Sequence, residues 1–164
     1  MEIGCFYFIV DSYFKDFPDK YIMSNKEVIG GATHDRPCFY SFQDNSTGLF
    51  WIIPFTSQLS KFQSIYDKKM SKYGKCDTIV FGDVLGYKKA FLIQNMCPII
   101  PKYIKNQYIE NLSCKPVRLN GKLEKELTSK AKKVLMLCRK GNKLIFPDIF
   151  KIENELLSQL PLGD

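Results

Sequence analysis

The chain has 164 residues, enough for one ordinary domain with a hydrophobic core. Hydrophobic residues make up 45% and aromatic residues 14%, a composition that excludes an intrinsically disordered chain. Lysine and arginine number 24 against 17 acidic residues, so the formal net charge of +7 favours a polyanionic partner, nucleic acid before membrane.

The first predicted strand spans Gly4–Val10, and because it is apolar on both faces we expect it in the middle of a sheet. A short aromatic turn containing Tyr13 follows. The segment Tyr21–Ile29 is only weakly patterned, and Gly30-Gly31 predicts a flexible segment that runs to Pro37.

Two strands, Cys38–Gln43 and Leu49–Ile53, flank a turn-rich cluster and therefore predict a hairpin. Pro54 ends the second strand because proline cannot donate to a sheet ladder. A helix follows, with apolar residues three to four positions apart. It begins at Ser57 or Ser60 and ends near Gly74.

Beyond this helix, strands Asp77–Phe81 and Tyr87–Ile93 flank a Gly82–Gly86 turn, and Met96–Ile100 predicts a short edge strand. Residues 102–109 predict one or two helical turns.

Two helices are predicted near the C-terminus. Asn120 opens the longest helix, whose core face carries Leu123, Leu127, Ala131, Val134 or Leu135, and Cys138, and Gly141 closes it. Pro147 takes the first position of the last helix, with Ile149, Ile152 and Leu156 facing inward. Residues 158–164 are expected to be a frayed tail.

Short, mostly hairpin-linked strands with inserted and C-terminal helices predict an α+β fold in one domain over residues 1–164. We expect a compact, strongly curled antiparallel β-sheet, close to a small SH3-like barrel. A flat α+β sandwich is the alternative.

The six cysteines show no C-x-x-C spacing and the chain has one histidine, so neither a metal site nor a cofactor is expected. Buried free thiols in a reducing cytosol fit them better. No apolar run approaches the roughly 20 residues that cross a bilayer, and no secretory signal is visible at the N-terminus. We therefore expect a cytoplasmic protein with no membrane partner.

Thr56 and Ser57 place two adjacent hydroxyl groups where a strand feeds a helix N-terminus, a place where a phosphate can bind. The alternative is ordinary capping by Ser57 or Ser60. From Lys61 to Lys75 there are five lysines and one acid. These lysines predict contacts with RNA phosphates, or else a solvated helix face; the candidate RNA-binding residues are Lys61, Ser64, Lys68, Lys69 and Lys72.

A basic chain without evident metal ligands favours a metal-independent ribonuclease, in which the 2′-hydroxyl of RNA attacks the adjacent phosphorus. This reaction needs a base, donors for the phosphorane oxygens and an acid for the leaving 5′-oxygen. His34 belongs to the side-chain type that exchanges protons near neutral pH. Arg36 offers fixed charge, and Tyr13 offers a hydroxyl or a stacking ring. Each also fits an ordinary structural role, so base and acid stay unassigned.

The ordered motifs Phe6-Tyr-Phe-Ile9 with Tyr13, Arg36-Pro-Cys-Phe39 and Trp51-Ile-Ile-Pro-Phe-Thr-Ser57 resemble the type III toxin–antitoxin endoribonucleases of the ToxN/AbiQ family. Lys75-Cys-Asp-Thr-Ile-Val-Phe-Gly82 and Gly86-Tyr-Lys-Lys-Ala-Phe-Leu-Ile-Gln-Asn95 are typical of its CptN branch. The resemblance extends to about Leu157.

This resemblance implies a curled Kid/MazF-like sheet and metal-independent RNA cleavage that leaves a 2′,3′-cyclic phosphate. The implied partners are cellular mRNA and a repetitive RNA antitoxin, whose pseudoknots inhibit the toxin in a closed RNA–protein assembly. Growth arrest and abortive phage infection would follow. Thr56, Ser57 and Tyr13 match family positions, and Arg36 stands where the best-known branch has lysine. Leu59 replaces a second family lysine, so Lys61 is the nearest lysine here and His34 gains weight as the proton-transfer group.

The same residues also fit two other functions. One is an RNA-binding module without catalysis that uses the same basic groove. The other is an interaction protein whose charge serves only solubility.

Overall fold

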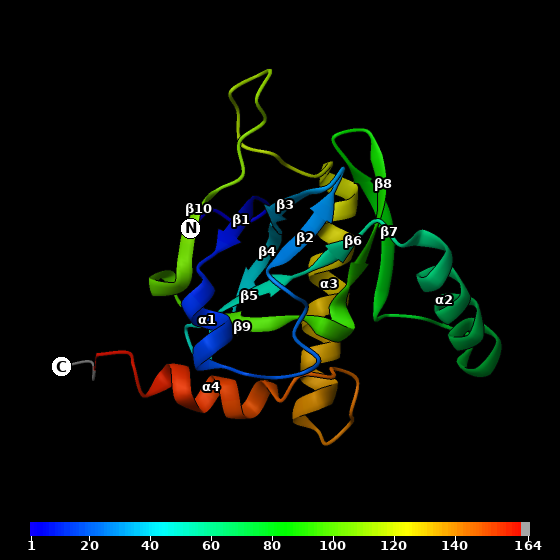
Figure 1. Cartoon of the computed structure of the whole chain (residues 1–164). Coiled ribbons are helices and arrows are strands. Elements are labelled where there is room, and N and C mark those ends of the chain that lie inside the picture. The colour runs from blue at the N-terminus through cyan, green and yellow to red at the C-terminus, as the bar shows by residue number, and fades with distance from the viewer. Residues whose placement is uncertain (162–164) are drawn as a thin grey trace.

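A computed structural model describes residues 1–161 of the chain and has an α+β architecture built on antiparallel sheets (Figure 1). The largest sheet has the strand order β10-β1-β4-β5-β9. Its strands are β10 (Ile104–Gln107), β1 (Phe6–Ile9), β4 (Cys38–Gln43), β5 (Phe50–Ile53) and β9 (Cys97–Ile99). The predicted hairpin, the central place of the first strand and the edge strand near residue 98 are confirmed.

A second sheet has the order β6-β8-β7 and begins where the first one ends. It contains β6 (Phe55–Thr56), β7 (Ile79–Val84) and β8 (Tyr87–Leu92). Pro54 separates β5 from β6 in the chain, and its carbonyl accepts a hydrogen bond from the backbone N–H of Leu92 at 2.9 Å. One nearly continuous strand therefore joins the two sheets. The predicted Gly82–Gly86 turn is shorter in the structure, because the ladder continues to Val84 and only Leu85-Gly86 turn.

The segment predicted to be flexible is a regular hairpin. Strands β2 (Lys26–Ile29) and β3 (Ala32–Asp35) pair over four residues each, and Gly30-Gly31 forms the two-residue turn with positive φ angles of 58° and 81°. Glycine adopts such angles at little steric cost, and tight hairpins require them. The glycine pair was therefore a turn signal, and reading it as flexibility was wrong.

Two further predictions of local structure need correction. Residues 102–109 form a single 3₁₀ turn, Pro101–Tyr103, followed by β10 rather than a helix, because β10 completes the exposed edge of β1. The aromatic turn after β1 is a short helix, α1 (Asp11–Asp16).

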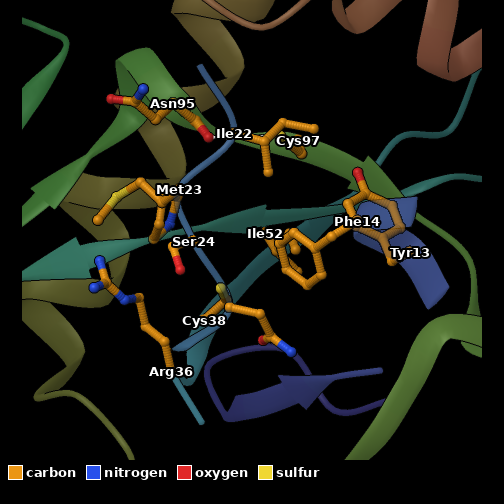
Figure 2. A pocket seen from close by; sticks show the side chains of 12 residues that line it. Tyr13, Phe14, Ile22, Met23, Ser24, Arg36, Cys38, Ile52, Asn95 and Cys97 are labelled. Carbon is orange, nitrogen blue, oxygen red and sulfur yellow. Dashed lines mark hydrogen bonds between the residues drawn. The ribbon is translucent and has the colours of Figure 1, made fainter. Parts of the chain in front are cut away.

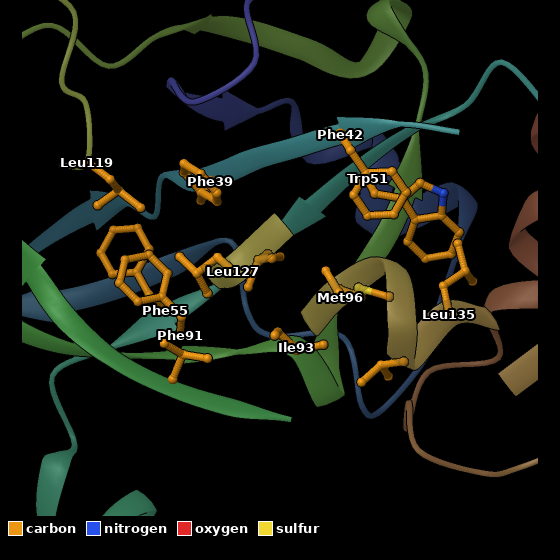
Figure 3. Close-up of a cluster of buried hydrophobic side chains, with 14 of the residues drawn as sticks. Phe39, Phe42, Trp51, Phe55, Phe91, Ile93, Met96, Leu119, Leu127 and Leu135 are labelled. Atoms are coloured by element: carbon orange, nitrogen blue, oxygen red, sulfur yellow. The ribbon is translucent and has the colours of Figure 1, made fainter. Parts of the chain in front are cut away.

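The main core lies between the two sheets and the longest helix, α3 (Gly121–Arg139). Figure 3 shows rings and aliphatic chains from β4, β5, β6 and β8 meeting side chains of α3. Every predicted inward residue of α3 is buried, and the side chain of Asn120 caps the helix by accepting from the N–H of Leu123. Helix α4 (Ile149–Leu157) covers β9 and buries its three predicted residues. Asp148 is its N-cap, so Pro147 precedes the helix and the prediction that Pro147 takes the first helical position is wrong.

Helix α2 (Leu59–Tyr73) stands against β8 at one side of the molecule and extends away from the large sheet (Figure 1). Gly74 ends it with φ of 68°, as predicted. The tail prediction is partly wrong: residues 158–160 keep backbone hydrogen bonds to the last turn of α4. Residues 162–164 lie outside the described part of the chain.

Within residues 1–161 the strands form three separate sheets, none of which closes on itself, so the predicted barrel-like curl stays a prediction. Across the same residues, each helix is too short or too polar to pass through a membrane. Five of the six cysteines are buried free thiols as expected, whereas Cys114 is exposed.

Candidate functional site

The predicted hydroxyl pair lies at the joint between β6 and α2. Thr56 is 8% exposed and pairs with Ala90 of β8, and its Oγ1 accepts a hydrogen bond from the N–H of Gln58 at 3.2 Å. Ser57, the next residue, leaves the ladder and is exposed. The end of the short strand thus holds one hydroxyl inside the protein and presents the other to solvent.

Neither predicted serine caps the helix. Helix α2 begins at Leu59 with Gln58 at the N-cap position, and the Gln58 side chain makes no capping hydrogen bond. Ser57 instead uses its carbonyl to accept from the N–H of Leu59 at 2.8 Å. The capping interpretation of Ser57 and Ser60 is therefore wrong, and the Ser57 hydroxyl is left for another partner.

That partner is Lys89, which the sequence analysis did not select. Its Nζ donates to Ser57 Oγ at 2.6 Å from the neighbouring strand β8. The accepting hydroxyl keeps its own hydrogen, and an ammonium group carries three donors, so the pair still offers hydrogen-bond donors and a positive charge to solvent. Three donor hydrogens and a positive charge at one exposed point suit the binding of a phosphate group.

One feature of the sequence could have pointed to Lys89 as a site residue. Lys88-Lys89 is an unusual pair inside a predicted strand, and successive strand side chains point to opposite faces. Which of the two lysines faces Ser57 depends on the pairing of Thr56 with Ala90 and of Gly82 with Lys89. The first of these pairings links positions 34 residues apart, which local patterns do not reveal.

Arg36 lies just before β4, and its side chain is only 17% exposed. The nearest carboxylate, Glu27 of β2, is 3.6 Å from Nη2, too far for a hydrogen bond, and the buried Nε has no partner within residues 1–161. Most of the fixed donors of this guanidinium are therefore uncommitted.

Arg36 and Pro54 line the same narrow, mostly apolar hollow, in which Figure 2 shows Arg36 and Cys38 at one end and Tyr13 and Phe14 at the other. The hollow measures about 20 Å³, which is room for about one water molecule. Pro54 precedes Ser57 by three residues, at most about 11 Å of extended chain. The hollow thus brings Arg36 near the strand that carries the hydroxyl pair, but it is too small for a nucleotide.

His34 is exposed on β3 and pairs across the hairpin with Glu27, the residue whose carboxylate faces Arg36. Directly opposed side chains on an antiparallel ladder lie about 5 Å apart at Cβ. His34 and Glu27 therefore lie on one face of the β2–β3 hairpin, and the Glu27 carboxylate on that face is the group nearest to the Arg36 guanidinium. No contact joins His34 to Ser57 among the described residues.

Tyr13 lies apart from this group. It is 1% exposed, its hydroxyl donates to the carbonyl of Pro98 at 2.8 Å, and its ring packs against Phe17 and Tyr103. Burial raises the pKa of this phenol well above its ordinary value. Because its single hydrogen is already donated inside the core, Tyr13 has no donor left for a substrate.

The lysines of α2 divide into two groups. Lys61, Lys68 and Lys72 are exposed, and Ser64, Lys68 and Lys72 line a shallow groove on the outer face of the helix. Lys69 points inward: its Nζ donates to Thr78 Oγ1 at 2.6 Å and to Gln94 Oε1 at 3.0 Å.

Burial lowers the pKa of the Lys69 ammonium. Neighbouring residues on a helix point about 100° apart, so Lys69 lies on the side of α2 that meets the protein while Lys68 does not. Lys69 therefore anchors α2 and does not belong to the exposed set in which the sequence analysis placed it.

No cluster of three or more histidine, cysteine or acidic side chains suited to a metal occurs within residues 1–161. In comparisons with known proteins, no family model matches the chain and no curated protein sequence is significantly similar to it.

Proposed function

We propose that this protein is a metal-independent endoribonuclease whose reaction centre is the Ser57–Lys89 pair. The observation that carries the proposal is the 2.6 Å hydrogen bond from Lys89 to Ser57 at the exposed joint of β6 and α2. The motifs that resemble the ToxN/AbiQ toxins include both Thr56-Ser57 and the Lys88-Lys89 strand.

In this reaction the 2′-oxygen of RNA loses its proton and bonds to phosphorus. The bond from phosphorus to the 5′-oxygen breaks, and that oxygen takes up a proton. Ser57 would donate a hydrogen bond to a non-bridging oxygen while Lys89 stabilises the charge that develops there. Arg36, held beside the same strand, would supply a second cation. His34 is the candidate for taking the 2′-hydroxyl proton, from the hairpin face that it shares with Glu27.

Lys89 also fills a gap in the family pattern. Leu59 occupies the position where the resemblance expects a lysine near the hydroxyl pair, and Lys61 lies two residues further along the helix. An ammonium reaching Ser57 from β8 would provide the same charge from a different strand. The exposed lysines of α2 would hold the RNA backbone as it leaves the site.

By the same resemblance, the substrates would be cellular mRNA and the precursor of a repetitive RNA antitoxin, whose pseudoknots would inhibit the toxin in a closed assembly. A curled, Kid/MazF-like arrangement of the sheets is part of this proposal. It is supported by the strand that passes from β5 through Pro54 into β6 and so links two sheets.

The test is cleavage of a mixed-sequence RNA by the purified protein in EDTA, with analysis of the 3′ ends. We expect 2′,3′-cyclic phosphate products from the parental protein and from Ser129→Ala, which removes an exposed serine of α3 as a matched control. Ser57→Ala should lose most of this activity. If the parental protein binds RNA but leaves it intact, the protein is an RNA-binding module, the alternative that the exposed lysines of α2 favour.

A further inference from the structure

A second hollow, far from Ser57, is lined by aromatic rings. Tyr21, Phe146 and Phe150 are 43%, 40% and 42% exposed and share an open hollow of about 610 Å³ beside the α3–α4 connection. This volume lies in the range of about 300–1,000 Å³ typical of ligand sites. The clustering is specific, because the other exposed aromatic residues of the described chain, Tyr73 and Tyr87, lie on different elements.

Hydrogen bonds to the segment that contains Gln94 and Asn95 hold the backbone of Tyr21 and Phe146 in place. The carbonyl of Tyr21 accepts from Asn95 Nδ2 at 2.9 Å, and the N–H of Phe146 donates to the carbonyl of Gln94 at 2.8 Å. The centroids of the Tyr21 and Phe146 rings are 5.8 Å apart, with an angle of 48° between their planes. The two rings therefore form a preorganised aromatic surface at the hollow, and Lys20 Nζ lies over the Tyr21 ring at 4.9 Å from its centroid.

Two lysines and two aspartates line this hollow, so its formal charge is balanced, but the lysines are the groups left free to meet an anion. Lys20 and Lys143 line it, and neither makes an ion pair within residues 1–161. The nearby carboxylates serve the fold: Asp19 accepts from the backbone N–H groups of Tyr21 and Asp148, and Asp148 caps α4 by accepting from Lys151. Lysines without an ion pair beside exposed rings are a combination that binds single-stranded nucleic acid, through its phosphates and the faces of its bases.

The hollow lies well away from the Ser57–Lys89 pair. Gly82 pairs with Lys89 and lies against Leu123 in the first turn of α3, whereas Cys138 at the other end of α3 lines the hollow. Fifteen helical residues separate Leu123 from Cys138, a rise of about 22 Å. Figure 1 shows the two ends of α3 at opposite sides of the molecule. A stacked RNA strand, at about 3.4 Å per nucleotide, needs about six nucleotides to cover this distance.

We propose that the Tyr21–Phe146–Phe150 hollow stacks bases of single-stranded RNA several nucleotides away from the phosphodiester that is cleaved. The proposal rests on the proposed function in taking RNA as the ligand. It assigns the hollow to substrate and antitoxin binding, and not to chemistry.

The test measures binding of a 2′-O-methyl RNA of about 20 nucleotides, which lacks the attacking hydroxyl and so reports binding without cleavage. We expect the double variant Tyr21→Ala/Phe146→Ala to bind about 5- to 150-fold more weakly for each stacked base lost. Tyr73→Ala/Tyr87→Ala, which removes the exposed rings elsewhere, is the matched control and should bind within about twofold of the parental protein. Thermal unfolding confirms that each variant is folded.

Two single variants separate stacking from other causes. Tyr21→Phe keeps the ring and should keep parental affinity, whereas Phe146→Leu keeps apolar bulk without a ring and should lose affinity. Photocrosslinking of the full chain with RNA that contains 4-thiouridine should place crosslinks on Tyr21 or Phe146. RNA affinity equal to that of the parental protein in the folded double variant, or crosslinks confined to other regions, would overturn the proposal.

The two proposals fail in different ways. A protein that binds the methylated RNA at the hollow but cuts no unmodified RNA refutes the ribonuclease proposal alone. A protein that cuts RNA, with affinity unaffected by loss of both rings, refutes the stacking proposal alone.

Discussion

A double-mutant cycle on Ser57 and Lys89 tests whether the two side chains act as one unit. We expect Ser57→Ala and Lys89→Met each to lower the cleavage rate by about 10²–10³, the usual loss when one donor to a developing oxyanion is removed. If the 2.6 Å hydrogen bond makes the two side chains act as one catalytic unit, the double variant should cleave RNA almost as fast as either single variant. Independent contributions would instead multiply to about 10⁴–10⁶.

Loss of folding does not explain such an effect, because an exposed polar pair contributes only about 0–1 kcal/mol to stability. All three variants should therefore unfold within a few degrees of the parental protein. The matched control is Lys88→Met, which removes the neighbouring lysine from the opposite face of β8 and should retain most of the activity.

Rates must be measured under single-turnover conditions with protein in excess over RNA, so that chemistry is separated from product release. Multiplicative losses in the double variant would refute the idea that Lys89 acts through Ser57. Parental rates in either single variant would remove that residue from the site.

Three further predictions concern binding and stability. Replacing Lys68 and Lys72 with glutamine should weaken binding to all RNA sequences and lower the salt slope by about one unit per phosphate contact, measured by titration at several salt concentrations; an unchanged slope would place the backbone contacts elsewhere. Burial opposes ionisation of Asp44, but hydrogen bonds from Arg139 and Ser46 lower its pKa to about 2. The stability that this carboxylate gives is present above its ordinary pKa of about 3.9 and is lost as pH falls toward 2. Thermal unfolding should therefore show Asp44→Asn less stable than the parental protein at pH 6 and closer to it near pH 2; a constant difference would contradict this. A methyl group on Gly82 would overlap the side chain of Leu123, so Gly82→Ala should cost about 1–3 kcal/mol in denaturant unfolding, whereas parental stability would mean that α3 can shift freely.

The elements that the sequence predicted well are those whose residues follow a strong local period. The buried face of α3 recurs every three to four residues, and the β4–β5 hairpin has apolar runs on both sides of a turn cluster. The errors fall where local signals are weak. Strand β10 is polar and exists because β1 offers it an unpaired edge, while the β2–β3 hairpin depends on turn geometry at Gly30-Gly31.

The candidate site shows the same division. Thr56 and Ser57 could be selected from the sequence, because a strand end followed by a helix is a local pattern. Lys89 could not, because its contact with Ser57 depends on how β6 pairs with β8. Lys69 was placed with the exposed lysines because charge alone does not reveal that Thr78 and Gln94 bind it from other elements.

By itself, the sequence determined the α+β class, the core faces of the C-terminal helices and the basic character of the chain, since each depends on residue type and short-range spacing. Only the tertiary structure decided which side chains meet: Lys89 with Ser57, Lys69 with the core, Tyr13 with Pro98, and three aromatic rings at one hollow. These contacts join residues distant in the chain, and they form only when strand register and helix docking bury the apolar faces together.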